Sequence, residues 1–313
     1  MKVSFVTCDV FTDRPFTGNQ LLVVPDARGL TTEQMQAVAR EINYSESTFV
    51  LPPKDPAHAY LQRTFVPVKE IPYAGHPTVG TAAVMASLGK VAAGARDGEI
   101  SVTIEVGFGP LALELLKKDG RVFRVRMQQG RPEWRAPVTG DDVKGQIAAA
   151  LGVPFDALHP SLPPQAVGTG NTFLMVPLAS VAAVSSALAD TRMLNHLEKA
   201  LSVLGLFFFA LDESSGRSRV RARMFAPGAG VPEDPATGSA AGPVGVYLAL
   251  HGAVPGGVRE GQGHFTIDQG IEMGRPSELD VTVLLEGGRP SSVRVEGGAV
   301  LMMRGELDVT ETR

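Results

Sequence analysis

Glu46 is the residue of this sequence whose type and setting best suit proton chemistry. It is the middle residue of Ser-Glu-Ser at positions 45–47, and an apolar run follows at 49–51. A carboxyl group held against apolar side chains resists ionisation, so its pKa rises towards neutrality, which suits general acid–base catalysis. The competing interpretation is an ordinary solvent-exposed glutamate in a loop. We predict that Glu46 is catalytic and that the Ser45 hydroxyl hydrogen-bonds the substrate.

Two stretches of the sequence occur twice, about half a chain apart. The segment 63–67 (Arg-Thr-Phe-Val-Pro) returns as 223–227 (Arg-Met-Phe-Ala-Pro), and 76–83 (His-Pro-Thr-Val-Gly-Thr-Ala-Ala) returns as 234–241 (Asp-Pro-Ala-Thr-Gly-Ser-Ala-Ala). Each copy has the pattern of a strand, a loop rich in glycine and proline, and the start of a helix. Two copies at this spacing indicate two related domains rather than a solenoid, which needs shorter repeats and more copies.

His76 and Asp234 occupy equivalent positions in the two copies, each directly before a proline suited to the first turn of a helix. A helix N-terminus has free N–H groups and a partial positive charge, so it attracts anions. If the two halves pack face to face, two such termini meet at one cleft, which would suit a substrate with a carboxylate. The competing interpretation is that both loops only cap helices, with Asp234 as an N-cap. Helix capping alone does not explain why equivalent positions hold a histidine and an aspartate. We therefore predict that both residues are catalytic.

Small residues beside these two positions are predicted to bind the substrate. Gly75 has no side chain and would allow a close approach. Gly238 and Ser239 would offer backbone N–H groups and a hydroxyl. Together with Ser45, these residues form the predicted substrate-binding set.

The residue inventory excludes or disfavours several kinds of catalysis. Cys8 is the only cysteine, which excludes a pair of thiols acting as acid and base. The other histidines lack the spacing of metal ligands, and neither a dinucleotide-binding glycine pattern nor a phosphate loop is present. We therefore expect no metal and no cofactor. Glu46 also has no acidic counterpart in the second half, where Leu204, Gly205 and Leu206 lie 158 to 160 positions later.

The elements that must position these residues alternate between strands and helices in both halves. Thr31 begins the first helix, with Gln34 three residues later as in a capping box. The pattern restarts after the segment 128–132, the best candidate for a linker. The expected strands lie at 3–11, 21–24, 48–51, 60–66, 100–106, 111–116, 122–127, 173–176, 204–211, 219–225, 279–285, 292–296 and 299–304, and the expected helices at 31–42, 77–88, 142–151, 181–188, 192–201 and from 237 onward.

A proline interrupts the last expected helix. Gly-Pro at positions 242–243 falls within the segment that should continue from residue 237. Proline lacks the N–H group that an interior helical residue donates, and its ring clashes with the preceding turn. We therefore expect this helix to kink or break at Pro243.

Composition limits the partners of the chain. Its 313 residues are 44% hydrophobic and 20% charged, which is ordinary for a globular protein with a sizeable core. The net charge of −4 and the absence of a basic run argue against nucleic acid. The longest strongly apolar stretch, 204–211, is far shorter than the ~20 residues of a membrane span. No signal-peptide pattern is seen, so we expect a cytoplasmic protein without a membrane partner.

Several motifs of this chain resemble the PhzF-like (phenazine biosynthesis) family. They are long, occur in the correct order and span nearly the whole sequence. One departure is Val-Gly-Thr-Gly at 167–170, where the family motif has a serine. The motifs are Asn-Tyr-Ser-Glu-Ser-Thr-Phe-Val at 43–50, Glu-Ile-Pro-Tyr-Ala-Gly-His-Pro-Thr-Val-Gly-Thr-Ala at 70–82, Glu-Asp-Pro-Ala-Thr-Gly-Ser-Ala at 233–240, and the shorter matches at 10–12, 16–19 and 273–277.

The resemblance implies the diaminopimelate-epimerase-like fold of the α+β class. This fold has two pseudo-symmetric domains, each a curved, mostly antiparallel sheet wrapped around a central helix. The expected domains are 1–128, to which the last strand at about 299–313 returns, and 129–298. The resemblance also implies a cofactor-free isomerase, often a homodimer, in which Glu46 shuttles the proton and His76 touches the substrate.

The predicted function is a cofactor-independent isomerase that moves a proton on a small carboxylate-bearing substrate, resembling dihydro-hydroxyanthranilate isomerase. Glu46 would remove and return the proton, while His76, Asp234 and Ser239 would orient the substrate. One alternative is an amino-acid epimerase that uses Glu46 and Asp234 as a pair. The other is a non-catalytic protein that binds a small acid.

Overall fold

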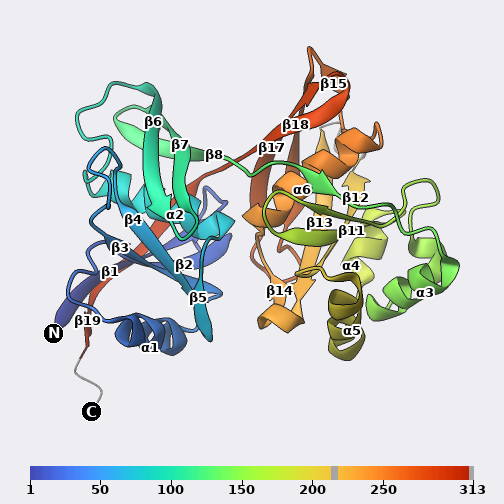
Figure 1. Ribbon diagram of the computed structural model, residues 1–313, viewed down its shortest axis with the longest axis horizontal. Helices are drawn as coiled ribbons and strands as arrows, with labels where there is room; N and C mark the ends of the chain where they lie inside the picture. The colour runs from blue at the N-terminus through green and yellow to red at the C-terminus, as the bar shows by residue number, and fades with distance from the viewer. Residues whose placement is uncertain (213–217, 310–313) are drawn as a thin grey trace. The chain divides into compact units, whose positions relative to one another are not determined.

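The computed structural model describes residues 1–212 and 218–309, and the chain divides into two compact units. Unit 1 combines Met1–Gln128 with the C-terminal segment that begins at Glu296, and unit 2 comprises Gln129–Val295. Figure 1 follows the chain from its blue N-terminus to its red C-terminus. In the described part of the chain, no helix is both long enough and apolar enough to span a membrane.

Unit 1 is built from strands packed around a buried helix. The last strand of the chain pairs antiparallel with the first, as the blue and red strands of Figure 1 show. The elements of this unit are β1 (Lys2–Val10), β2 (Asn19–Val24), α1 (Thr32–Ile42), β3 (Glu46–Leu51), β4 (Leu61–Val66), β5 (Lys69–Ile71), α2 (Gly75–Ser87), β6 (Gly98–Val106), β7 (Gly109–Lys118), β8 (Arg121–Gln128) and β19 (Ala299–Asp308).

Unit 2 has a second buried helix, α6, and more strands than the sequence predicted. The unpredicted strands are β9, β10, β14, β15 and β16. The elements are β9 (Glu133–Trp134), α3 (Asp141–Ala150), β10 (Gln165–Gly168), β11 (Thr172–Pro177), α4 (Val181–Ser186), α5 (Thr191–Leu201), β12 (Leu206–Asp212), β13 (Arg219–Ala226), β14 (Val231–Asp234), α6 (Gly238–Leu250), β15 (Val258–Arg259), β16 (Gln262–Gln269), β17 (Ser277–Glu286) and β18 (Arg289–Gly297).

The two units repeat the same order of strand directions. In unit 1, β2 runs parallel to β3, β3 is antiparallel to β4, and β4 pairs antiparallel with β5 and parallel with β6. In unit 2, β11, β12, β13, β14 and β16 repeat these relations in the same order. The first parallel pair is joined by one helix, α1, in unit 1 and by two helices, α4 and α5, in unit 2, and a buried helix follows β5 and β14. The prediction of an α+β fold with two pseudo-symmetric halves is confirmed.

The repeated arginine has the same role in both units. Arg63 forms a two-pronged ion pair with Glu70 across the β4–β5 hairpin, at 2.8 and 2.6 Å. Arg223 forms the equivalent pair with Glu233 across β13 and β14, at 2.8 and 3.0 Å. Each pair fixes a hairpin that leads to a buried helix, so this part of the repeat is structural.

Helix α1 begins as the sequence predicts. The Thr31 hydroxyl accepts from the Gln34 N–H at 3.2 Å, and the Gln34 side chain accepts from the Thr31 N–H at 2.9 Å, so the capping box is confirmed. Its buried face, which includes Met35 and Val38, packs with apolar residues of β2, β3 and β4. The helix ends at Asn43, which adopts the left-handed conformation (φ 55°) that asparagine tolerates.

The central helix of unit 1, α2, lies against the sheet with almost no intervening space. It packs on β1, β2, β3, β8 and β19. A methyl group at Gly80 would lie 2.6 Å from side-chain atoms of both Leu21 and Val10, so only glycine permits this approach. The helix begins at Gly75 rather than at the predicted Pro77, which places His76 inside its first turn.

The central helix of unit 2, α6, is continuous from Gly238 to Leu250, so the predicted break at Pro243 is wrong. Proline inside a helix costs about 3 kcal/mol because one hydrogen bond is lost and the ring crowds the preceding turn. Here the helix is buried along most of its length and packs against β10, β11, β16 and β17. This packing holds the helical path through the proline.

Candidate active site around Glu46 and His76

Glu46 is the first residue of β3, where the chain re-enters the sheet after α1. Its side chain is only 16% exposed, and its Oε2 lies 3.5 Å from Nδ1 of His76. Burial raises the pKa of the Glu46 carboxyl to about 7. The Glu46 carboxyl can therefore both accept and donate a proton near neutral pH.

His76 is buried in the first turn of α2, with an exposed fraction of 3%. Pro77 follows it, as the repeat predicted, and Gly75 begins the helix. Ala74 occupies the N-cap position and has no polar side chain that could satisfy the first N–H groups of the helix. The structure thus places an imidazole and a helix N-terminus beside the Glu46 carboxyl.

Asn19 connects Ser45 to His76 and was not assigned a role from the sequence. It begins β2 and is 2% exposed. Its Oδ1 accepts a hydrogen bond from the Ser45 hydroxyl at 3.1 Å, and its Nδ2 lies 3.3 Å from Nδ1 of His76. One signal could have revealed this residue: Thr-Gly-Asn occurs at both 17–19 and 169–171, as a further trace of the repeat.

Asp234 lies at the end of β14 and is 6% exposed. The N-cap of α6 is Thr237, and so the interpretation of Asp234 as an N-cap is wrong. The Thr237 hydroxyl donates to Oδ2 of Asp234 at 2.6 Å and makes no capping bond to the helix. Gly238 and Ser239 are the first two residues of α6, which begins four positions after Asp234.

Two buried amides that the sequence did not reveal hold the start of α6. Gln269 in β16 accepts from the Thr237 N–H at 3.1 Å, and its Nε2 donates to the Asp234 carbonyl at 2.7 Å. Gln129 donates to the Gly238 carbonyl at 2.6 Å. Gln129 fell within the predicted linker, and Gln269 lies in a strand that was not predicted. Their buried amides show that both positions are part of the support of this loop.

Strand β3 begins with Glu46, whereas the corresponding strand β12 begins with Leu206, so only unit 1 has an acidic residue at this strand start. Glu46 pairs with Leu21 across the parallel β2–β3 ladder, and Leu206 pairs with Leu174 across the equivalent β11–β12 ladder. Leu206 is fully buried in the apolar core of unit 2. The two halves therefore share a fold but not a carboxyl group at this position.

Cys8 lies in the first strand, away from solvent. Cys8 is buried in β1, and burial raises the pKa of its thiol, so it is inert at neutral pH. Across residues 1–212 and 218–309, no group of three or more His, Cys, Asp or Glu side chains is arranged to hold a metal ion.

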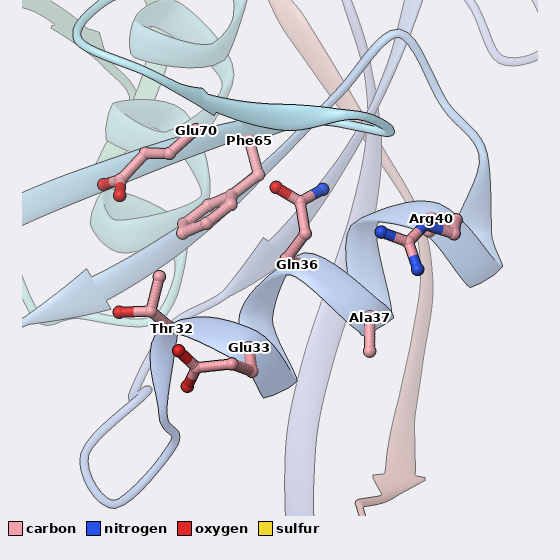
Figure 2. Close-up of a pocket in the computed structure, with 7 residues that line it drawn as sticks. All are labelled: Thr32, Glu33, Gln36, Ala37, Arg40, Phe65 and Glu70. Carbon is pink, nitrogen blue, oxygen red and sulfur yellow. The ribbon is translucent and has the colours of Figure 1, made fainter. Parts of the chain in front are cut away.

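A hollow of about 360 Å³ lies between α1 and the β4–β5 hairpin, and neither Glu46 nor His76 lines it. Figure 2 shows Gln36 and Phe65 beside it, with Glu70 and Thr32 at one end. Three of its polar side chains have partners within the fold: Arg63 contacts Glu70 and Thr32, and Gln36 donates to the carbonyls of residues 66 and 67. We assign this hollow a structural role.

Comparison with known proteins finds similarity along nearly the whole chain. Residues 8–305 match the family described as "Phenazine biosynthesis-like protein". A trans-2,3-dihydro-3-hydroxyanthranilate isomerase of Pseudomonas chlororaphis is 37% identical over 303 residues, which cover 97% of this chain and 98% of that protein. Further relatives of similar length are also named as isomerases.

Solved structures share the whole fold. A PhzF-family phenazine biosynthesis protein of Bacillus anthracis superposes with a TM-score of 0.86 at 25% identity, over 99% of this chain and 100% of that one. A probable proline racemase of Agrobacterium radiobacter K84 superposes with a TM-score of 0.66 over 98% and 93% of the two chains. At 14% identity, the second match shows the fold alone. The family resemblance seen in the sequence motifs is confirmed.

Proposed function

Because this chain belongs to the phenazine biosynthesis-like family, whose curated relatives are named as isomerases, we propose that it is a cofactor-independent isomerase in which Glu46 moves a proton on a small carboxylate-bearing substrate. The observation that carries the proposal is the Glu46 carboxyl, which has a pKa raised to about 7 and lies 3.5 Å from His76. A group with this pKa changes its protonation state readily under ordinary conditions, as a general acid–base catalyst must.

In the proposed mechanism, ionised Glu46 takes a proton from a carbon of the substrate and returns it to another carbon. The electron pair left after proton removal moves through the conjugated system towards the carboxylate. Backbone N–H groups at helix N-termini stabilise this charge, an interaction that often supplies much of the catalytic effect. His76, Asp234 and Ser239 orient the substrate, with Ser45, Gly75 and Gly238 completing the proposed binding residues.

The first substrate to test is trans-2,3-dihydro-3-hydroxyanthranilate, which the 37% identical relative is named for. The substrate class we propose is the amino- or hydroxyl-bearing cyclic carboxylate with an acidic C–H bond. We further propose, from the resemblance alone, a cytoplasmic homodimer that needs no metal. Light scattering measures the dimer, and exhaustive chelation should leave turnover unchanged.

Proton transfer is tested by turnover in heavy water. The wild-type protein should incorporate deuterium at carbon, and Glu46→Gln should reduce the exchange rate by about 10²–10⁴-fold while retaining substrate binding. The exchange rate should rise with pH through about 7, because Glu46 must be ionised to act as the base. If Glu46→Gln exchanged deuterium at the wild-type rate, another residue would be the one that transfers the proton. Binding without any exchange would favour a non-catalytic protein, and exchange with inversion at one carbon would favour an epimerase.

A further inference from the structure

Two side chains of unit 1, Asn19 and Glu46, lie close to Nδ1 of His76, and Ser45 hydrogen-bonds Asn19. The Asn19 amide nitrogen lies 3.3 Å from this atom, and Glu46 Oε2 lies 3.5 Å from it. On its other side, the Asn19 amide oxygen accepts from the Ser45 hydroxyl at 3.1 Å. Since Asn19 is 2% exposed and lies at the start of a strand, its amide is held in place by its surroundings.

The orientation of the Asn19 amide determines what Nδ1 of His76 must do. The hydroxyl proton of Ser45 is given to Oδ1, which leaves the NH₂ group facing the imidazole. An amide nitrogen only donates hydrogen bonds. Nδ1 must therefore accept, and a neutral imidazole that accepts at Nδ1 carries its single proton on Nε2.

The alternative state would disable the proposed base. If Nδ1 carried a proton as well, His76 would be an imidazolium ion next to the Glu46 carboxylate, and the two charges would stabilise each other. The proton would then be held between two protein side chains instead of passing to and from the substrate. A donor placed at Nδ1 disfavours this state.

We propose that Asn19 is a positioning residue: its amide, oriented by Ser45, holds His76 as the neutral tautomer protonated at Nε2 and so keeps the mobile proton on Glu46. The inference rests on the proposed role of Glu46 as the proton carrier. Ser45 thereby acts on His76 through Asn19, in addition to the substrate contact expected from the sequence.

The tautomer can be observed directly, without substrate. Long-range proton–nitrogen correlation spectra of protein labelled with ¹⁵N-histidine distinguish a protonated ring nitrogen from an unprotonated one, and the His76→Gln variant identifies the His76 signals. In the wild type at pH 8, Nε2 should be protonated and Nδ1 should not. Asn19→Ala should move proton population to Nδ1, and Asn19→Asp should do so more strongly because a carboxylate accepts from Nδ1–H.

Two controls separate Asn19 from its neighbours. Glu46→Gln should leave the His76 tautomer unchanged, which shows that the amide rather than the carboxyl sets it. Gln20→Ala should also leave it unchanged, because Gln20 follows Asn19 in β2 and its side chain points to the opposite face of the strand. Asn19→Asp keeps the size of the side chain, so it tests the tautomer if Asn19→Ala fails to fold.

Kinetics give a second readout. In Asn19→Ala and Asn19→Asp, kcat for deuterium exchange should fall about ten-fold, while KM changes much less. This is the effect expected of a residue that orients a reacting group. A proton on Nδ1 in the wild type, an unchanged tautomer in Asn19→Ala, or a rise in KM alone would overturn the inference. Failure of the wild type to exchange any proton would instead contradict the proposed function, since the tautomer is measured without turnover.

Discussion

Glu46 and Glu198 show that a raised pKa alone does not identify a catalytic residue. Burial raises the pKa of both carboxyl groups to about 7. Glu198 lies in α5 and accepts from the N–H of Gly228 at 3.0 Å, so it holds the turn that precedes β14. Only Glu46 lies beside an imidazole at a helix N-terminus. The chemistry of the neighbouring groups distinguishes the proposed catalyst from the structural carboxyl.

The raised pKa of Glu46 predicts a cost in stability. Because its pKa in the folded protein, about 7, exceeds its ordinary value of 4.5, the folded state binds this proton more tightly than the unfolded state. The contribution of Glu46 to the free energy of unfolding therefore falls as pH rises from about 4.5 to about 7. Glu46→Gln removes this penalty. The increase in its free energy of unfolding over the wild type should therefore be about 2 kcal/mol larger at pH 8 than at pH 5.

Urea denaturation of the wild type and Glu46→Gln at both pH values checks this expectation. Glu198→Gln is the matched control, since it should show the same pH-dependent gain in stability while its proton exchange stays at the wild-type rate. A Glu46→Gln variant that is equally stabilised at pH 5 and pH 8 would show that burial does not raise this pKa.

Asp234 is expected to act on substrate binding rather than on proton transfer. Asp234→Asn keeps an oxygen that can accept from Thr237 but loses the negative charge. Hydrogen bonds to charged groups contribute about 1.5–3 kcal/mol, so KM should rise about 10- to 100-fold, with kcat falling no more than KM rises. Steady-state kinetics measure both. Glu233→Gln is the control, because the Glu233 carboxylate binds Arg223. This variant should lower stability without the change in KM. A fall in kcat alone would make Asp234 a proton carrier.

At the scale of elements, each unit contains a buried helix that starts after a hairpin fixed by an ion pair. The Arg63–Glu70 and Arg223–Glu233 pairs fix the hairpins, and the helices then enter the core. Nevertheless, the helices start at different points of the repeat. Gly75 begins α2 one residue before His76, whereas Gly238 begins α6 four residues after Asp234. The same sequence pattern thus presents a side chain from a helix in one unit and from a strand end in the other.

Close packing of α2 predicts opposite effects for two glycine substitutions. Gly80→Ala would place a methyl group 2.6 Å from atoms of Leu21 and Val10, so it should lower the free energy of unfolding by about 1–3 kcal/mol and reduce proton exchange by displacing His76. Gly145 lies inside α3 with open space at the same position, so Gly145→Ala should raise stability by about 0.5–1 kcal/mol. Chemical denaturation measures both, and equal effects would contradict the packing argument.

At the scale of the whole molecule, unit 1 is assembled from both ends of the chain. β19 pairs with β1 from Lys2↔Asp308 to Val10↔Ala299. On its other side, β1 pairs with β2, which begins at Asn19. The N-terminal residues that position the proposed site are therefore held by the last strand. A segment of about 170 residues, Gln129–Val295, forms unit 2 between them.

Removal of the last strand should therefore disable unit 1. Truncation after Gly298 leaves β1 with an unpaired edge, and such edges promote aggregation. We expect loss of proton exchange together with rapid hydrogen exchange of the β1 amides, measured by mass spectrometry. A control that lacks only residues 310–313 retains all of β19 and should behave as the wild type. An active, monodisperse protein after truncation at Gly298 would show that β19 is dispensable.

Local signals in the sequence determined much of this protein by themselves. The capping box of α1, the alternating strands and the repeat predicted the elements, because these patterns act within a few residues. The family motifs predicted the fold class and singled out Glu46 and His76. The sequence also shows no acidic counterpart to Glu46, in agreement with the start of β12 at Leu206.

Only the tertiary structure decided which distant side chains meet. Gln269 holds Thr237 from 32 residues away, and Asn19 reaches His76 across 57 residues, distances over which sequence patterns carry no contact information. Packing also overrode a local rule when it kept α6 continuous through Pro243. The reason is the same in each case: burial forces polar groups to find partners and helices to follow the core, and the fold alone determines what lies within reach.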